Sequence, residues 1–128
     1  MIIKWIAHSC FTVTLENGTV MVFDPFENIG YDMPQIKADF VFVSHSHHDH
    51  NAVHALAGDF TLFDKVGVFE KNGIQIEGIA SYHDKHDGKD RGSNIIFKVK
   101  AEGVTLVHFG DLGHLPDESV IEKVKSAD

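Results

Sequence analysis

The feature that most constrains the fold is a nearly continuous apolar run from Phe40 to Ser44 that leads directly into a cluster of histidines. Such a run predicts a strand covered on both faces, because a solvated face would place polar residues at alternate positions. The segment that follows, residues 45–51, reads HSHHDHN. Five of the ten histidines lie between positions 45 and 54, which indicates metal or proton chemistry at a strand end.

The rest of the sequence predicts strands joined by tight turns. Asn17-Gly18 is a strong hairpin signal, and Asp24-Pro25 ends a strand and leaves Asp24 at its end. Pro116 opens a helix with acidic residues first and lysines last, as the helix dipole favours. The expected strands are residues 2–6, 10–15, 19–23, 40–44, 66–70, 74–80, 94–100 and 104–109, with an irregular connection at 26–39, a short helical stretch ending near Leu56 and a charged loop at 84–92.

Composition narrows the class of protein. A chain of 128 residues with 43% hydrophobic content is expected to form a single domain, residues 1–128, with its own core. The net charge of −8 and the absence of a basic stretch disfavour nucleic acid as a partner. The lone Cys10 excludes a disulfide framework and a thiolate zinc cluster. Without a signal-peptide pattern or a long apolar segment, the expectation is a cytoplasmic protein with no membrane partner.

The order of residues in the histidine segment fits two metal ions. If the strand continues past Ser44, its period of two places His45 and His47 on one side, where two imidazoles can bind one divalent cation. Asp49 and His50 come after the chain turns, so they face a neighbouring position. A second ion about 3.5–4 Å from the first would complete a two-metal hydrolytic site. A carboxylate beside the metal can orient water and accept its proton. Asp49, together with the adjacent His50, is therefore the candidate for catalysis.

The pattern His45-x-His47-x-Asp49-His50 after an apolar strand resembles the signature of the metallo-β-lactamase superfamily. Other residues typical of the family appear in the family's order, namely Asp24, His83 and Asp111. Several short segments resemble those of the branch that contains ascorbate-6-phosphate lactonase and many metal-dependent hydrolases. These segments are Ala7-His8-Ser9-Cys10-Phe11, Arg91-Gly-Ser-Asn94 and the GDLGH motif at 110–114.

The resemblance implies an α/β fold of the α+β type, a metallo-β-lactamase-like αββα sandwich with mostly antiparallel sheet and short helices. It assigns His45, His47 and His83 to a first metal, Asp49 and His50 to a second, and Asp111 to a bridge between them. Asp24 would support the ligands by accepting a hydrogen bond from one of them. His8, Asn94 and, more weakly, His114 would line the substrate site. The ions implied are two divalent metals, zinc first, with manganese or iron as alternatives.

Members of the family usually have about twice this length. The chain therefore resembles the N-terminal half to two-thirds of the fold, and the late histidine that normally completes the second metal site is missing. His114 could replace it only if its loop folds back, and His86 is the alternative to His83. The chain would then be a fragment, or a half completed by another copy in a homo-oligomer.

The implied activity is hydrolysis of a small ester, lactone or phosphoester, in which metal-bound hydroxide attacks the substrate. An anionic substrate could meet Lys89 and Arg91 on the charged loop. Two alternatives stay open, namely a phosphodiesterase or nuclease of the same fold, and a non-catalytic half-domain that binds metal and assembles with another chain.

Overall fold

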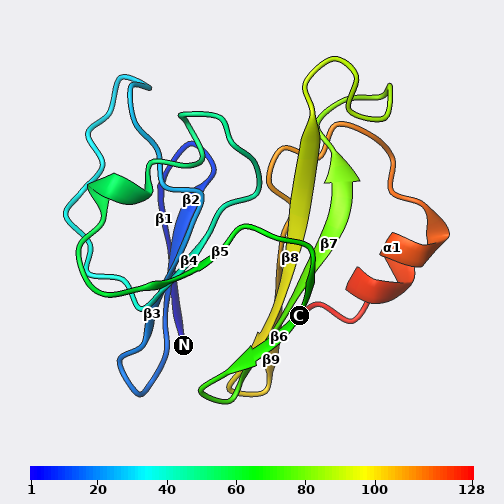
Figure 1. The fold of residues 1–128 in the computed structure, drawn as a ribbon. Coiled ribbons are helices and arrows are strands. Elements are labelled where there is room, and N and C mark those ends of the chain that lie inside the picture. Colours follow the sequence, from blue (N-terminus) through cyan, green and yellow to red (C-terminus); the bar gives the residue numbers. More distant parts are fainter. The chain divides into compact units, whose positions relative to one another are not determined.

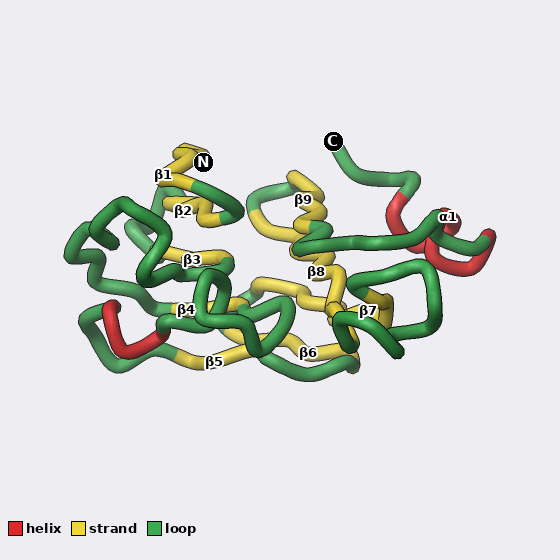
Figure 2. The backbone as a smooth tube through the Cα atoms, turned by 90° about the horizontal axis from the view of Figure 1, so that it is seen from above, coloured by secondary structure: helices red, strands yellow, loops and turns green.

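The computed structural model describes all residues from Met1 to Asp128. The chain folds into two compact units, Met1–Asp64 and Lys65–Asp128. Most of the chain is strand and loop, and the helices, red in Figure 2, are the short segments Val53–Ala55 and Glu118–Val124. Neither is long and apolar enough to cross a membrane. The expectation of a single domain stays a prediction.

The first unit is built on a five-stranded sheet in the order β1-β2-β3-β4-β5 (Figure 1). Its first three strands are antiparallel, whereas β4 runs parallel to both β3 and β5. Because parallel strands end at the same edge of a sheet, the residues that follow β3 and β4 leave it side by side. The elements are β1 (Ile2–Ala7), β2 (Cys10–Thr14), β3 (Val20–Phe23), β4 (Phe40–Phe42), a 3-10 helix at Val53–Ala55 and β5 (Thr61–Phe63).

The prediction of a strand covered on both faces is confirmed for β4. The side chains of Phe40, Val41, Phe42 and Val43 are all buried, with at most 7% exposure. Phe42 stacks between two rings, with centroids 4.4 Å from Phe23 and 5.1 Å from Phe63. Two residues on the other face, Val41 and Val43, belong to a cluster with Phe26 and Cys10. β5 was not predicted, because three residues are too few to separate a strand from a loop.

Cys10 is a core residue. Its side chain is fully buried. Burial, with a smaller contribution from the charge of Asp24, raises the pKa of the Cys10 thiol to about 12. A thiol that remains protonated at neutral pH is not a nucleophile.

The second unit is a four-stranded antiparallel sheet in the order β6-β7-β8-β9, followed by one helix. Its elements are β6 (Gly67–Lys71), β7 (Ile74–Tyr82), β8 (Ser93–Ala101), β9 (Val104–His108) and α1 (Glu118–Val124). Both predicted hairpins are present, and β7 and β8 are each longer than expected. The register pairs Ile79 with Ile96 and Ser81 with Asn94, so these four side chains share one face of the sheet.

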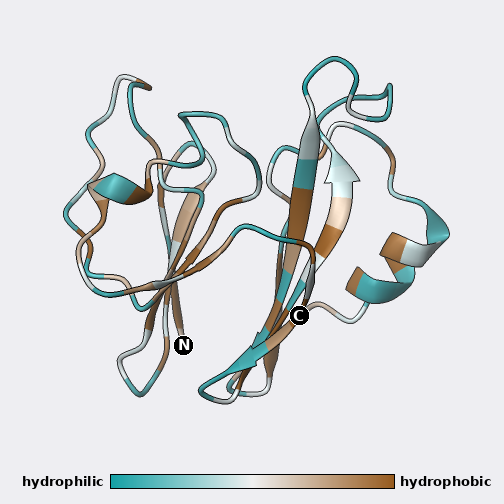
Figure 3. Cartoon of the chain, in the orientation of Figure 1, coloured by the Kyte–Doolittle hydropathy of each residue, from teal (hydrophilic) through white to brown (hydrophobic).

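The helix covers part of that face. α1 carries both hydrophobic and hydrophilic residues (Figure 3), and its buried Val120 packs against Ile79 and Ile96. Its first turn is capped by Asp117, whose carboxylate accepts a hydrogen bond from the Val120 N–H at 3.0 Å. The predicted helix is therefore confirmed, with its last residue at Val124.

Candidate metal centre

Asp24 lies where β3 ends, as its position before Pro25 predicts. Its backbone is left-handed, with φ at 45°, and its N–H donates to the carbonyl of Phe42 at 2.8 Å. Aspartate tolerates this conformation better than most residues, and strained residues of this kind concentrate at functional sites. The hydrogen bond holds Asp24 beside the residues that follow β4.

The Asp24 carboxylate holds two segments of the first unit together. It accepts hydrogen bonds from the Ser44 N–H and the Ser44 hydroxyl, both at 2.7 Å, and from His50 Nδ1 at 2.9 Å. Neither the Asp24 nor the His50 side chain has any solvent exposure. A carboxylate is stable in the protein interior when strong hydrogen bonds compensate for its lost hydration. The contact predicted between Asp24 and a candidate ligand is thus present.

These contacts also determine which ring nitrogens carry protons. A carboxylate only accepts, so His50 donates from Nδ1, and in its neutral, metal-binding form it carries its lone pair on Nε2. Ser44 gives its one hydroxyl proton to Asp24, so at 2.9 Å its oxygen accepts from His45 Nδ1. The neutral form of His45 therefore also carries its lone pair on Nε2. Both histidines have the hydrogen-bonding pattern of metal-binding imidazoles, whose second nitrogen donates to an oxygen.

The remaining residues of the histidine segment lie around this network. The ring of His45 is 4.1 Å from that of His50 and 4.6 Å from that of His47, measured between centroids. The Asp49 carboxylate lies 3.6 Å from His50 Nε2. Desolvation alone would raise the pKa of the Asp49 carboxyl, but His50, a main-chain hydrogen bond and His8 together lower it. The Asp49 carboxylate is therefore ionised at neutral pH and can act as an oxygen ligand to a metal.

His8 lies next to these residues, although it is far from them in the sequence. Its Nε2 is 3.0 Å from Asp49 Oδ2 and 3.2 Å from His50 Nε2. Donor atoms of His8, Asp49 and His50 all lie within 4.8 Å of one another. The sequence predicts only a substrate-lining role for His8.

In the second unit, two of the predicted metal ligands, His83 and Asp111, are in contact. His83 Nε2 lies 3.0 Å from Asp111 Oδ2, and both side chains retain some exposure. His86, the alternative to His83, is exposed and pairs with Asp90. The conformation of the segment before Arg91 is set by Asp84, whose carboxylate accepts from four main-chain N–H groups that belong to His86, Gly88, Asp90 and Arg91. Although burial opposes it, these bonds lower the pKa of Asp84 to about 2.

Asn94 fixes the loop that carries Asp111. Its side chain is 1% exposed. Its carbonyl oxygen accepts from the Asp111 N–H at 3.0 Å, and its amide donates to Phe109 O at 2.9 Å and to Ser81 Oγ at 2.8 Å. These contacts indicate that Asn94 positions the main chain of Asp111. The role of Asn94 in lining the substrate site stays a prediction.

His114 is hydrogen-bonded to the main chain at both ring nitrogens. Nδ1 donates to Leu115 O at 2.8 Å, and Nε2 accepts from the Tyr82 N–H at 3.2 Å. In this conformation neither nitrogen offers a lone pair to a ligand, because one carries a proton and the other accepts one. The expected substrate-lining role of His114 stays a prediction.

The approach of this loop to β7 requires a glycine at position 113. The Gly113 N–H donates to Tyr82 O at 2.9 Å, and an added Cβ would overlap main-chain atoms of His83 and Asp84. We therefore expect Gly113→Ala to lower the free energy of unfolding by about 1–3 kcal/mol, measured by urea denaturation. It should also displace His83 from Asp111, seen as a shift of the His83 imidazole NMR signals.

Gly103→Ala is the matched control, since nothing lies within 4 Å of its added Cβ and only its φ of +78° opposes the change. It should cost about 1–2 kcal/mol and leave the His83 signals in place. Unchanged His83 signals in Gly113→Ala would show that the contact does not position this histidine.

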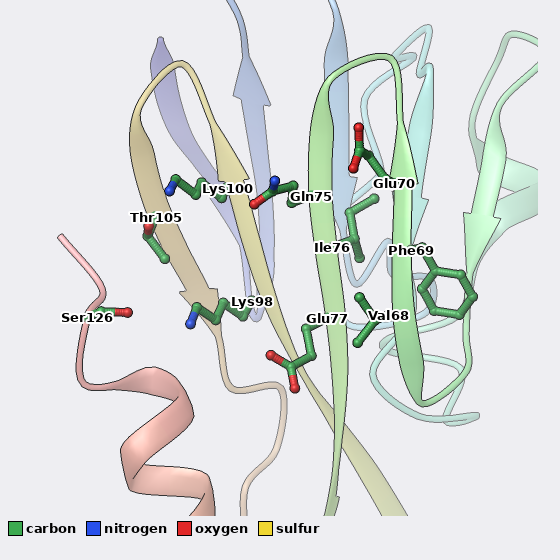
Figure 4. A pocket seen from close by; sticks show the side chains of 10 residues that line it. All are labelled: Val68, Phe69, Glu70, Gln75, Ile76, Glu77, Lys98, Lys100, Thr105 and Ser126. Carbon is green, nitrogen blue, oxygen red and sulfur yellow. The ribbon is translucent and has the colours of Figure 1, made fainter.

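A surface pocket of about 510 Å³ lies elsewhere on the second unit. Figure 4 shows its side chains over β6 to β9, with Ser126 on the segment after α1. Two of its charged residues contact Lys123 of α1, since Glu77 pairs with the Lys123 ammonium group and Lys98 donates to Lys123 O. No predicted site residue lines this pocket, so it is not the candidate centre.

Sequence reasoning did not identify two residues that organise the candidate ligands. Ser44 was included only as the end of an apolar strand, and its hydroxyl links Asp24 to His45. Asp84 was included only as the first residue of the charged loop at 84–92. An aspartate followed closely by glycine in a polar stretch is a recognised turn signal, so Asp84 could have been identified.

A family model described as a beta-lactamase superfamily domain matches residues 2–128. The chain belongs to the metallo-β-lactamase superfamily. Within the superfamily, the chain is similar to a solved structure from Thermotoga maritima that is named as a Zn-dependent hydrolase. The two share 36% identity with a TM-score of 0.80, over 98% of this chain and 57% of that one. This similarity confirms the predicted metallo-β-lactamase-like fold, with mostly antiparallel strands and little helix.

Two relatives named as metal-dependent hydrolases match over most of the chain. One, from Thermoplasma volcanium, is 27% identical over 95% of this chain and 66% of its own length. The other, from Archaeoglobus fulgidus, is 26% identical over 100% of this chain and 68% of its own length. The chain thus spans about two-thirds of the length of these relatives.

Proposed function

We propose that this chain carries the metal-binding residues of a hydrolase that acts on small anionic esters, lactones or phosphoesters. The observation that supports it best is the contact of Asp24 with Ser44 and His50, which places Nδ1 of His45 and of His50 on oxygen atoms and so makes Nε2 the acceptor atom of each neutral ring. Neutral imidazoles fixed in this way, beside the ionised Asp49, are a donor set that fits a divalent metal such as zinc.

The proposed ligands are those that the family resemblance implies. His45, His47 and His83 would bind one ion, Asp49 and His50 a second, and Asp111 both. Divalent ions at such a site act as Lewis acids and lower the pKa of water. Zinc suits this mixture of nitrogen and carboxylate ligands, and manganese and iron are the alternatives.

Residues of the chain itself would position the metal ligands and orient water. Asp24 keeps the His50 ring in one orientation and one protonation state, so the ligand is preorganised. Asp49, ionised and 26% exposed, can orient a water molecule and accept its proton. Asn94 holds the main chain of Asp111 and so limits the movement of that carboxylate.

The experiment that tests this proposal is metal analysis of His47→Ala. His47 is exposed, so its loss should leave the strand core folded, with an unchanged circular dichroism spectrum. We expect about two zinc ions per chain before the change, and loss of at least one after it, because a three-ligand site loses a ligand. Hydrolysis of a panel of anionic esters, lactones and phosphoesters should fall in parallel.

His54→Ala is the matched control, because His54 is also exposed and pairs only with Glu27. It should keep both ions and change stability by no more than about 1 kcal/mol. Full metal content and full rate in His47→Ala would contradict the proposal. Activity that falls steeply with added salt would instead favour a nuclease, because binding to a phosphate backbone weakens with salt.

A further inference from the structure

We propose that His8 is a metal ligand, and that His8, Asp49 and His50 form a three-donor site within the first unit. This inference rests on the proposed function, because it concerns the second of the two ions. It gives His8 a role different from substrate lining and supplies a third protein ligand from the first 64 residues of the chain.

The distances among the three donor atoms fit one small cation. Ligands that bind a tetrahedral zinc at about 2.0–2.1 Å lie about 3.3–3.4 Å from one another, as the geometry of a tetrahedron requires. The three separations are 3.0 Å for His8 to Asp49, 3.2 Å for His8 to His50 and 3.6 Å for His50 to Asp49. They lie on both sides of the tetrahedral value, so one ion can contact all three after small shifts.

A cation could contact all three donor atoms of this cluster, whereas the single proton of one hydrogen bond cannot. In the neutral ring of His50 the lone pair is on Nε2, because Nδ1 donates to Asp24. Asp49 Oδ2 is an ionised oxygen, so two acceptors converge on His8 Nε2. One N–H can donate well to only one of them. A divalent ion in place of that proton would be bound by both acceptors and by the His8 lone pair.

The backbone directs His8 toward this place. His8 lies in the turn between β1 and β2, where the pairing register shifts after Trp5, and its φ is 51°. The Trp5 indole N–H donates to His8 O at 2.9 Å and fixes the carbonyl. A left-handed histidine is uncommon, and such residues concentrate at functional sites. The side chain is 37% exposed, which allows an ion to reach it.

The other histidine considered for a third ligand is less suitable. His114 uses both ring nitrogens in hydrogen bonds with the main chain, so it would have to break one to bind a metal. His8 needs only to exchange a proton for an ion. The first unit thus supplies a donor set without movement of any other segment.

The test is a zinc titration of the full chain, followed by calorimetry, with His8→Asn as the variant. Asparagine accepts a left-handed backbone, so the variant should fold. We expect the weaker of two zinc sites to lose at least about 10-fold in affinity, or to disappear, while the other is unchanged. In the wild type, zinc should also shift the His8 imidazole NMR signals together with those of His50.

His54→Asn serves as the control and should leave both affinities unchanged. If the wild type binds two ions and His8→Asn binds them with affinities within about 3-fold of it, His8 is not a ligand and the proposed function still stands. If the wild type binds no zinc, both proposals are overturned. If His8→Asn loses both ions while circular dichroism shows it folded, the assignment of His8 to one site is wrong.

Discussion

Asp24→Asn should lower the zinc affinity of this chain by about 10–100-fold while leaving it folded, because outer contacts of metal ligands have effects of that size. An amide oxygen can still accept from the Ser44 N–H, but the amide nitrogen then faces Ser44 Oγ and His50 Nδ1. His50 Nδ1 must then accept, which moves the ring proton to Nε2 and removes the lone pair needed for the metal.

Two measurements check this result. Calorimetric zinc titration gives the affinity, and nitrogen-15 NMR of the imidazoles shows which nitrogen of His50 is protonated. The free energy of unfolding should fall by about 1–3 kcal/mol, since a buried hydrogen-bond partner becomes unsuitable.

Asp39→Asn is the matched control, because Asp39 likewise accepts a main-chain hydrogen bond, from the Val20 N–H at 2.8 Å, without contacting a histidine. It should keep the zinc affinity. A His50 ring that stays protonated at Nδ1 in Asp24→Asn, with full zinc affinity, would refute the role given to Asp24.

The largest effect on stability is expected for Asn94→Leu. Leucine has a similar volume but leaves the Asp111 N–H and the Phe109 carbonyl without the partner that Asn94 supplies. We expect the free energy of unfolding to fall by about 2–4 kcal/mol, because each partly buried group that loses its partner costs about 1–3 kcal/mol. Urea denaturation measures this loss.

Hydrogen exchange at the Asp111 amide is the second readout, and it should become much faster in Asn94→Leu. Ser81→Ala provides the comparison, because it removes one partner of Asn94 and leaves the bond to Asp111 intact. Its cost should be about 1 kcal/mol, with slow exchange at Asp111 preserved. Equal stability of Asn94→Leu and wild type would show that Asn94 does not fix this loop.

The sequence predicted most strands and the helix because their signals are local. The run at Phe40–Ser44, the turn at Asn17-Gly18 and the cap at Asp117 each act within a few residues. β5 was not predicted because three residues show no clear hydrophobic period. Its parallel pairing with β4 also depends on residues about twenty positions away.

The candidate site was predicted as a set of residue types, and less well as a set of contacts. The spacing of His45, His47, Asp49 and His50 is visible in the sequence and led to the family. The contact of His8 with His50 joins residues 42 positions apart, and no local pattern encodes it. Ser44 was missed for the same reason, since its importance comes from the position of Asp24 across two parallel strands.

The difference in topology between the two sheets has a consequence for folding kinetics. Every pair in the sheet of β6 to β9 joins consecutive strands, through connections of two, ten and two residues, 72–73, 83–92 and 102–103. In the other sheet, β3 must find β4 and β4 must find β5 across connections of 16 and 18 residues, Asp24–Asp39 and Val43–Phe60. Since contacts between distant residues form slowly, the hairpin sheet can nucleate first. The network around Asp24 would then be acquired in a later, slower step.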